Sequence, residues 1–305
     1  MRKIKLRAPG KINWTLDVKG KRPDGYHEVE MLMQSIGLWD EITLTEKKGS
    51  IGISGNSSDM PLDEGNLAVR AAKLVKQSCG VDAGVDIKIH KEIPVSAGLA
   101  GGSTDAAAVL VGLNALWGLG LTEESLAELG GKLGADVPFC IRGGTAVARG
   151  IGDKLTPLPP LEGIWLVLVK PPFGVSTASV YGVLSPDRIS VHPDWEKTYH
   201  RLRSADFTFL PQDMANVLEP VTTTRYPEIH TIRQALRKAG AAAGLMTGSG
   251  PTVFGVFRER RGAREASEKM KKLCSGVYLA ETLGKGAEII EGGSHDSNEC
   301  DCAGR

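Results

Sequence analysis

The sequence predicts an α+β fold with mixed sheets. Strand-like segments follow one another directly near the N-terminus, whereas strands and helices alternate further along, in both halves of the chain. A stretch rich in glycine and proline, residues 150–163, predicts a boundary between two domains, residues 1–155 and 156–285. Residues 286–305 are polar and glycine-rich, and we expect them to form a disordered tail.

Two short strands are expected at the start of the chain, residues 4–8 and 11–19, divided by Pro9 and Gly10. Alternation along the second strand predicts a single core face that carries Ile12, Trp14, Leu16 and Val18. The opposite face is polar, and the pattern alone favours solvent as its environment. That face carries Lys11, Asn13, Thr15 and Asp17.

The next elements are a turn, two strands and a helix. Pro23, Asp24 and Gly25 are typical of a tight turn, which presents Tyr26 and His27 at its exit. Strands are expected near 42–44 and 51–53, followed by a helix over 66–78. Its apolar face carries Leu67, Ala71, Leu74 and Val75.

The strongest signal is a glycine-rich loop between an alternating strand, residues 85–89, and an apolar helix, residues 106–117. Glycine lets the backbone approach a phosphate closely, and the first turn of a helix offers unpaired N–H groups. The loop therefore indicates a phosphate site, although a turn that only connects two elements has the same composition. The candidate phosphate-binding residues are Pro94, Val95, Ser96, Ala97, Gly98, Leu99, Ala100, Gly101, Gly102, Ser103 and Thr104.

Known phosphate-loop patterns of other folds are absent from the sequence. No Gly-Lys is followed by Ser or Thr, so there is no Walker A motif, and residues 98–102 lack the Rossmann G-x-G-x-x-G spacing. The His-Arg-Asp and Asp-Phe-Gly signatures of protein kinases are missing too.

An isolated acid follows the next helix, which is expected to begin at Thr122 and end near residues 130–131. Asp136 lies among small and apolar residues, so partial desolvation is expected. Two interpretations are open: Asp136 caps the turn that begins at Pro138, or it is a catalytic carboxylate.

The remaining expected elements are a buried strand at 165–169, a helix at 227–239, strands at 245–247 and 253–257 around a second glycine turn, a helix at 261–273 and a strand at 277–279.

Composition excludes several classes of protein. Among 305 residues, 37 Lys and Arg balance 36 Asp and Glu, so no electrostatic attraction to nucleic acid or membrane is expected. No stretch approaches the roughly 20 apolar residues of a membrane span, and the N-terminus lacks a secretory signal, so we expect a soluble cytoplasmic protein. The five cysteines are expected to be reduced thiols. Cys300, Cys302 and His295 could bind a metal, but a disordered tail is favoured there.

The glycine loop resembles the P-x-x-x-G-L-G-G-G-S-S-D-A-A motif of the GHMP kinases, a family of small-molecule kinases. Ala100 replaces the second glycine of the motif, and Thr104 replaces its second serine. Because alanine disfavours a positive φ, this loop is expected to hold phosphates slightly differently.

Four further blocks resemble one branch of these kinases: residues 8–13, 22–27, 134–139 and 216–220. That branch uses ATP to phosphorylate the 2-hydroxyl of a cytidine-diphosphate-linked methylerythritol in the non-mevalonate isoprenoid pathway. The resemblance implies an N-terminal ribosomal-S5-like nucleotide-binding domain and a C-terminal ferredoxin-like α/β sandwich. It also implies a monomer or weak homodimer.

The same resemblance implies the roles of particular residues. Lys11 and Asp136 are the catalytic pair, and residues 94–104 bind the phosphates of ATP. Magnesium is expected to bridge those phosphates, with Ser103 as its candidate protein ligand. The remaining residues implied to contact the substrates are Asn13, Tyr26, His27, Tyr181, Gly248, Ser249 and Gly250.

Two other functions remain open at this point. A GHMP kinase for mevalonate or homoserine would share the loop, although the turn at 22–27 argues against it. A non-catalytic RNA-binding relative would share the fold, but the neutral charge and the presence of Lys11 and Asp136 oppose it.

Overall fold

The computed structural model describes residues 2–208 and 213–292. His295, Cys300 and Cys302, for which a disordered tail was favoured over a metal site, lie outside these ranges. In chain order the elements are β1 (Lys3–Lys21), β2 (His27–Lys48), β3 (Ile51–Gly55), α1 (Leu67–Cys79), β4 (Ala83–His90), α2 (Gly101–Trp117), α3 (Glu123–Gly131), α4 (Val137–Arg142), β5 (Thr145–Arg149), β6 (Lys154–Leu158), β7 (Trp165–Lys170), α5 (Thr177–Val183), the 3-10 helix η1 (Pro186–Arg188), α6 (Trp195–Arg203), α7 (Glu219–Arg225), α8 (Glu228–Lys238), β8 (Ala243–Met246), β9 (Val253–Phe257), α9 (Arg260–Met270), β10 (Gly276–Leu283) and β11 (Glu288–Glu291).

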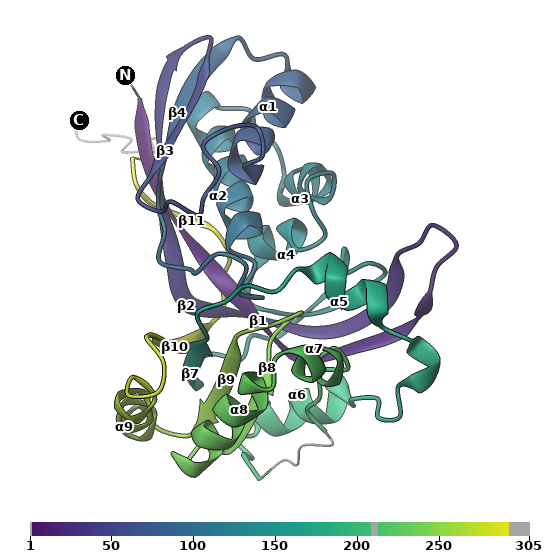
Figure 1. Ribbon diagram of the computed structural model, residues 1–305. Helices are drawn as coiled ribbons and strands as arrows, with labels where there is room; N and C mark the ends of the chain where they lie inside the picture. The colour runs from purple at the N-terminus through teal and green to yellow at the C-terminus, as the bar shows by residue number, and fades with distance from the viewer. Residues whose placement is uncertain (1, 209–212, 293–305) are drawn as a thin grey trace, which may run out of the picture.

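The first half of the chain is a sheet covered on one face by helices. β1 and β2 form a long antiparallel pair, β2 also pairs with β4 and β5, and β3 pairs with β4 in parallel. Helices α1 to α4 lie together beside these strands in the upper part of Figure 1. Apolar side chains of α1 and α2 fill the space between the helices and the sheet, where Leu44, Ile87 and Leu110 are almost completely buried.

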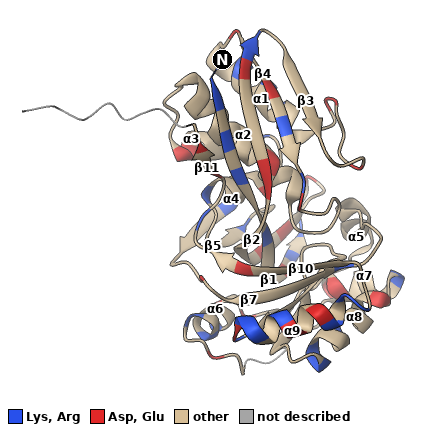
Figure 2. Cartoon of the chain, turned by 90° about the vertical axis from the view of Figure 1, so that its left-hand side faces the viewer, with Lys and Arg blue, Asp and Glu red and all other residues tan. Residues whose placement is uncertain are grey.

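The second half has an antiparallel sheet in the order β10-β7-β9-β8. Helices α8 and α9 pack on one face of it, where Ile229, Ala263 and Val167 share one apolar core. Charges of both signs lie along α8 and α9, on the outer side of the lower sheet (Figure 2). This mixture of antiparallel sheets, one parallel pair and helices confirms the predicted α+β class.

The two sheets are joined, because strands near the C-terminus return to the first half. β10 pairs with β7 and also with β2, and β11 pairs with β1. Residues 288–291 are thus part of the sheet, so the tail does not begin at residue 286 as expected. The division into domains at residues 155 and 156 stays a prediction.

β1 corrects two expectations about the start of the chain. Pro9 and Gly10 do not end a strand, because Pro9 pairs with Trp39 and a shift in register before Lys11 absorbs the irregularity. A second shift lies between Asn13 and Thr15. As a result, the four apolar side chains expected on one face are divided between two cores, Ile12 and Trp14 in one and Leu16 and Val18 in the other.

The polar face of β1 is buried, so the expectation of a solvent-exposed face is wrong. The exposed fractions of Lys11, Asn13, Thr15 and Asp17 are 5% or less. Segments from the second half cover these side chains: Thr247 contacts Asn13, and His192 lies 2.8 Å from Asp17. This cover places polar groups between the two halves of the molecule, where they hydrogen-bond rather than face water.

Other local predictions agree with the structure. Asn66 and Thr122 cap α1 and α3 with their side chains, and α2, β4, β7, β8, β9, α8, α9 and β10 occupy the expected regions. β2 is much longer than the strand expected near 42–44, and β5, α5 and α6 had no clear signal. In the described part of the chain, no helix has the length and apolar character that crossing a membrane requires.

Candidate active site

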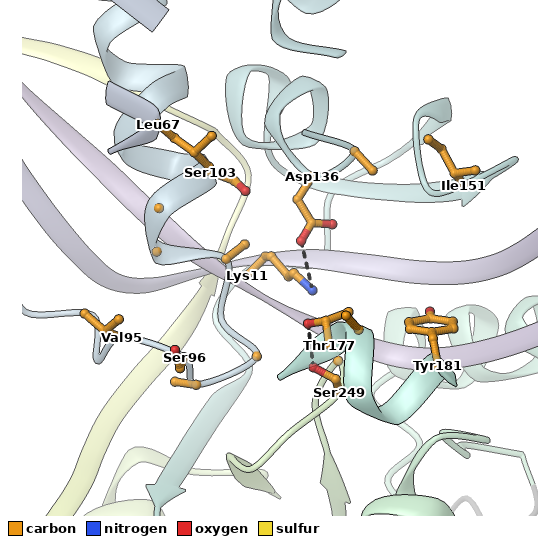
Figure 3. Close-up of a pocket in the computed structure, with 18 of the residues that line it drawn as sticks. Lys11, Leu67, Val95, Ser96, Ser103, Asp136, Ile151, Thr177, Tyr181 and Ser249 are labelled. Atoms are coloured by element: carbon orange, nitrogen blue, oxygen red, sulfur yellow. Dashed lines mark hydrogen bonds and ion pairs between the residues drawn. The ribbon is translucent and has the colours of Figure 1, made fainter. Parts of the chain in front are cut away.

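A cavity of about 880 Å³ lies between the two halves of the molecule. Its lining comes from the glycine loop, the start of α1, the turn between β1 and β2, the start of α4, helix α5 and the turn before β9. Figure 3 shows side chains of the glycine loop, α1, α4, α5 and the turn before β9 around one space, with Lys11 and Asp136 near its centre. The segments that the sequence singled out are thus brought together.

The glycine loop forms one wall of the cavity and ends at the N-terminus of α2. Gly98 has φ +76°, and Ala100, the N-cap of α2, is left-handed with φ 60° and ψ 28°. Ala100 makes no side-chain cap hydrogen bond, so the N–H groups of the first turn are not capped from there. A helix N-terminus with uncapped N–H groups is suited to bind a phosphate.

Alanine at position 100 therefore adopts the conformation that was expected to be disfavoured. A Cβ atom in this left-handed region of backbone conformation costs roughly 1–2 kcal/mol.

We expect Ala100→Gly to keep full turnover and to change the free energy of ATP binding by less than about 1 kcal/mol, because relief of strain is offset by the entropy of ordering glycine. The KM for ATP reports the change in ATP binding, and the melting temperature reports the relief of strain in the folded protein. A large loss of ATP affinity would instead show that Ala100, which lines the cavity, contacts the nucleotide.

Two predicted phosphate-binding residues do not line the cavity. Leu99 is fully buried in the core, and Thr104 is fully buried with its hydroxyl donating to the carbonyl of Pro9 at 2.7 Å. The carbonyl of Leu99 accepts a hydrogen bond from the backbone N–H of Lys11 at 3.1 Å. Both residues thus fix the loop to β1. The other nine residues of the predicted set, Pro94 to Gly98 and Ala100 to Ser103, line the cavity.

The proposed catalytic pair lies at the centre of the cavity. The Lys11 ammonium is 3.7 Å from the nearer carboxylate oxygen of Asp136 (Figure 3). Asp136 occupies the N-cap position of α4 but makes no side-chain cap hydrogen bond, so the capping interpretation is not supported. The Asp136 side chain is 31% exposed, whereas that of Lys11 is 6% exposed. A carboxylate that is open to the cavity and held near a buried ammonium can accept a proton from a bound hydroxyl.

Asn13 lies behind this pair and does not line the cavity. Its side-chain oxygen accepts a hydrogen bond from the Lys11 ammonium at 2.8 Å, and its amide nitrogen contacts the Met31 sulfur. Asn13 is fully buried. The structure therefore gives Asn13 a contact with Lys11, rather than the substrate contact that was expected.

The other end of the cavity is aromatic. The rings of His27 and Tyr181 have centroids 5.2 Å apart and planes tilted by 39°. Tyr181 comes from α5, and the structure places its ring beside that of His27, where the turn between β1 and β2 ends. Tyr26 also borders the cavity but is 61% exposed.

His27 combines burial with an unpaired nitrogen. Its Nε2 atom is buried and finds no hydrogen-bond partner among the described residues. Burial, and next the nearby Lys21 charge, lower the pKa of His27 below its ordinary value, so the neutral imidazole is the main form at neutral pH.

The second glycine turn packs directly against the glycine loop. A Cβ on Gly98 would lie 2.4 Å from the carbonyl oxygen of Thr247, so the two backbones approach as closely as only glycine allows. Gly248 and Ser249 line the cavity, whereas Gly250 does not. The Ser249 hydroxyl is 2.9 Å from that of Thr177 at the start of α5 (Figure 3).

A buried charge cluster beside the glycine loop was not found from the sequence. The Lys91 ammonium is 2.5 Å from Asp40 and 2.8 Å from Asp105, and Asp40 also accepts the backbone N–H groups of Glu92 and Ile93. Burial raises the pKa of Asp105 to about 8, the Lys91 charge opposes this rise and the Asp40 charge adds to it. The cluster fixes the chain as it enters the loop. The position of Asp105 directly after the loop is a signal that could have indicated a buried acid there, but Lys91 and Asp40 carry no local signal in the sequence.

The residues around the phosphate wall fit a magnesium ion that is held mainly by substrate phosphates. Within residues 2–208 and 213–292 no three His, Cys, Asp or Glu side chains cluster as a metal site. Mg²⁺ bound to a nucleotide usually takes only one or two protein ligands, and the Ser103 hydroxyl at the start of α2 faces the cavity near Asp136 (Figure 3).

These features define a phosphotransferase for a small molecule. One wall is a glycine loop at a helix N-terminus, the centre holds a carboxylate and an ammonium, and the far end is aromatic. Phosphoryl transfer depends on such positioning and on electrostatic stabilisation of the transferred group.

Comparisons with known proteins agree with this class. Residues 66–144 match the model for the GHMP kinases N terminal domain, and residues 197–276 match that for the GHMP kinases C terminal. Solved structures show the same fold, including a homoserine kinase from Cytophaga hutchinsonii (20% identity, TM-score 0.73, 95% of this chain and 98% of that chain covered). The protein is a GHMP kinase, and the two-domain α+β fold that the resemblance implies is confirmed.

More similar relatives define the branch. The 4-diphosphocytidyl-2-C-methyl-D-erythritol kinase of Alkaliphilus metalliredigens is 46% identical over 93% of this chain and 98% of its own length, and that of Bacillus cereus is 47% identical over the same shares. A crystal structure of a 4-(cytidine 5'-diphospho)-2C-methyl-D-erythritol kinase superposes with a TM-score of 0.79 at 34% identity, covering 92% of this chain and 100% of that one. The chain belongs to the 4-diphosphocytidyl-2-C-methyl-D-erythritol kinase family.

Proposed function

We infer that this protein transfers the γ-phosphoryl group of ATP to the 2-hydroxyl of 4-(cytidine 5'-diphospho)-2-C-methyl-D-erythritol, a step of the non-mevalonate isoprenoid pathway. The names of relatives about 46% identical over 93% of the chain support this reaction. The observation that carries it in the structure is the His27 ring, which lines the acceptor end of the cavity beside Tyr181. Likeness to mevalonate and homoserine kinases at 20% identity or less concerns the fold alone.

The central residues explain how a sugar hydroxyl becomes a nucleophile. Such a hydroxyl keeps its proton at neutral pH, so Asp136 accepts the proton as the oxygen attacks phosphorus. Lys11 then stabilises the negative charge that develops on the attacking oxygen and on the transferred group. Asn13 holds the Lys11 ammonium at 2.8 Å, and so keeps it directed toward the carboxylate.

The glycine loop and the start of α2 hold the phosphates of ATP. Backbone N–H groups of the loop bind oxygens that carry charge, and the close approach of the turn at 247–250 closes this wall. Magnesium, held by Ser103 and the phosphates, would neutralise further charge on the transferred group.

The aromatic end of the cavity suits a cytosine ring. Cytosine presents an amino donor next to acceptor atoms on one edge. A neutral imidazole carries one donor and one acceptor nitrogen, so the His27 ring can pair with this edge while Tyr181 packs against the base. Tyr26, at the mouth of the cavity, adds a partly exposed ring contact.

Removal of the His27 ring tests this assignment. We expect His27→Ala to raise the KM for the cytidine-linked acceptor by about 10-fold or more, because unpaired groups of a buried base cost about 1–3 kcal/mol. The KM for ATP should barely change. Since the neutral ring is already the main form at pH 7, the acceptor KM of the wild type should stay flat as pH rises from 7 to 8.

Free CDP provides the control. It should compete with the acceptor in the wild type and lose potency against His27→Ala and Tyr26→Ala, whereas Tyr26→Phe keeps the ring and should be mild. Failure of CDP to compete in the wild type would remove the cytosine assignment and leave a GHMP kinase with a different acceptor. The cytoplasmic location and the monomer or weak homodimer expected from the sequence stay predictions.

A further inference from the structure

The block at residues 216–220 was found in the sequence without a role, and the structure shows what it contacts. It leads into α7 and lies against the turn between β8 and β9, residues 246–250. Asn216 and Glu219 have exposed fractions of 3% and 5%, and Thr222, one turn further along α7, has 1%. Three polar side chains are therefore buried next to a turn that lines the active site.

These side chains bind backbone atoms of the turn. The Asn216 amide donates both of its hydrogens, to the carbonyl of Met246 at 2.8 Å and to that of Gly248 at 2.7 Å. A Glu219 carboxylate oxygen accepts the N–H of Met246 at 2.9 Å, and the other pairs with Arg233. The Thr222 hydroxyl donates to the carbonyl of Ser249 at 3.3 Å. Hydrogen bonds thus fix the turn along most of its length.

The opposite side of the turn reaches three parts of the active site. The Thr247 hydroxyl accepts the backbone N–H of Asn13 on β1 at 3.0 Å. Gly248 and Gly98 approach each other backbone to backbone, which links the turn to the phosphate wall. The Ser249 hydroxyl contacts Thr177 on α5, the helix that carries Tyr181. A shift of this turn therefore moves groups at the catalytic, phosphate and acceptor ends together.

We propose that Asn216, Glu219 and Thr222 are positioning residues that hold the turn at 246–250 in the geometry required for phosphoryl transfer. None of the three needs to touch a substrate for this role. The inference rests on the proposed function for the identity of the acceptor substrate. The contacts that hold the turn do not depend on that function. Because displacement of about 1 Å can cost roughly 100-fold in rate, loss of these bonds should act on kcat more than on binding.

Isosteric substitutions separate positioning from stability. Asn216→Asp keeps the size and the acceptor oxygen, but it places a carboxylate oxygen against two carbonyls that require donors. We expect kcat to fall by about 30- to 100-fold. The affinity for CDP should change by about threefold at most, because the described contact of the turn with the acceptor end is the hydroxyl contact of Ser249 with Thr177, whereas His27 lies on β2. Retained CDP binding also reports that the acceptor end is folded.

A matched pair of threonines isolates a single hydrogen bond. Thr222 and Thr224 both donate to a carbonyl of their own helix, but only Thr222 also reaches Ser249. Thr222→Val should lower kcat by about 3- to 10-fold, the loss expected for one hydrogen bond. Thr224→Val, at an exposed position on the same helix, should leave kcat unchanged.

Glu219 supplies the rescue. Glu219→Gln keeps an oxygen that can accept the Met246 N–H, so most of kcat should be retained, whereas Glu219→Leu cannot accept it and should lose at least about 10-fold. Melting temperatures are measured for all variants, and kcat is compared well below them. If the variants melt earlier but turn over as the wild type does, the residues are structural and the inference is wrong.

Failure of the proposed function is distinguishable from failure of this inference. A wild type that does not phosphorylate the cytidine-linked acceptor contradicts the function. ATP hydrolysis without acceptor is measured for the same variants, and it should fall in the same order because the turn also borders the phosphates. Equal hydrolysis rates across the series would overturn the inference, whatever the acceptor is.

Discussion

Asp136→Asn is expected to lower kcat by about 1000-fold, within the range for loss of a general base, while the KM for ATP stays close to the wild-type value. The substitution keeps the size of the side chain and its place at the start of α4, but an amide cannot take the proton of the acceptor hydroxyl. Because Asp136 makes no side-chain cap hydrogen bond, α4 does not lose a cap. Single-turnover rates at saturating substrates measure the chemical step directly.

The neighbouring carboxylate Glu124 provides a matched control for charge. It is 71% exposed and pairs with Arg142 at the far end of α4. Glu124→Gln removes the same charge near the same helix, and it should leave kcat within about twofold because exposed ion pairs contribute little. If Asp136→Asn keeps more than half of the wild-type kcat, the acid is not the base and another group must accept the proton.

The glycine loop could be predicted from the sequence because its signal is local. Three glycines and neighbouring hydroxyls lie between a strand and a helix, and every one of these features lies within a short stretch. The structure keeps nine residues of this set at the cavity. The exceptions, Leu99 and Thr104, bind β1 instead, and nothing in the loop itself reveals that contact.

The environment of β1 could not be predicted in the same way. Alternation separates an apolar face from a polar one, but it does not say what covers each face. The polar face is buried by groups far along the chain, such as Thr247, which lies 234 residues from its partner Asn13. The same limit applies to Lys91 and Asp40, which are 51 residues apart.

The prediction of the residues at the acceptor end depended on the family resemblance rather than on a sequence pattern. A Tyr-His pair after a turn is common, and nothing in its spacing indicates a base-binding site. Tyr181 lies in a different half of the chain, and only the packing of α5 against the turn between β1 and β2 brings its ring to His27. Asp136 is an intermediate case, because the sequence left two interpretations open and the absence of a cap hydrogen bond favours one.

Lys11→Met is the second substitution with a large expected effect. Methionine fills a similar buried space, since the Lys11 side chain is only 6% exposed, but it removes the charge that faces the reacting atoms. Loss of a group that stabilises charge in the transition state costs about 100- to 1000-fold in kcat. The loss should appear in kcat more than in the KM for ATP, because the glycine loop still holds the phosphates.

The double variant Lys11→Met with Asp136→Asn decides whether the two residues act as a unit. Their charged atoms are 3.7 Å apart, so both groups can act on the same attacking hydroxyl. Without Asp136, Lys11 has no developing alkoxide to stabilise, and without Lys11 the carboxylate loses its partner. Residues that act together in this way show grossly non-additive losses. The double variant should therefore be about as slow as the worse single variant, roughly 1000-fold below the wild type. A loss near the product of the two single effects, about 100,000-fold or more, would show that proton removal and charge stabilisation are independent in this enzyme.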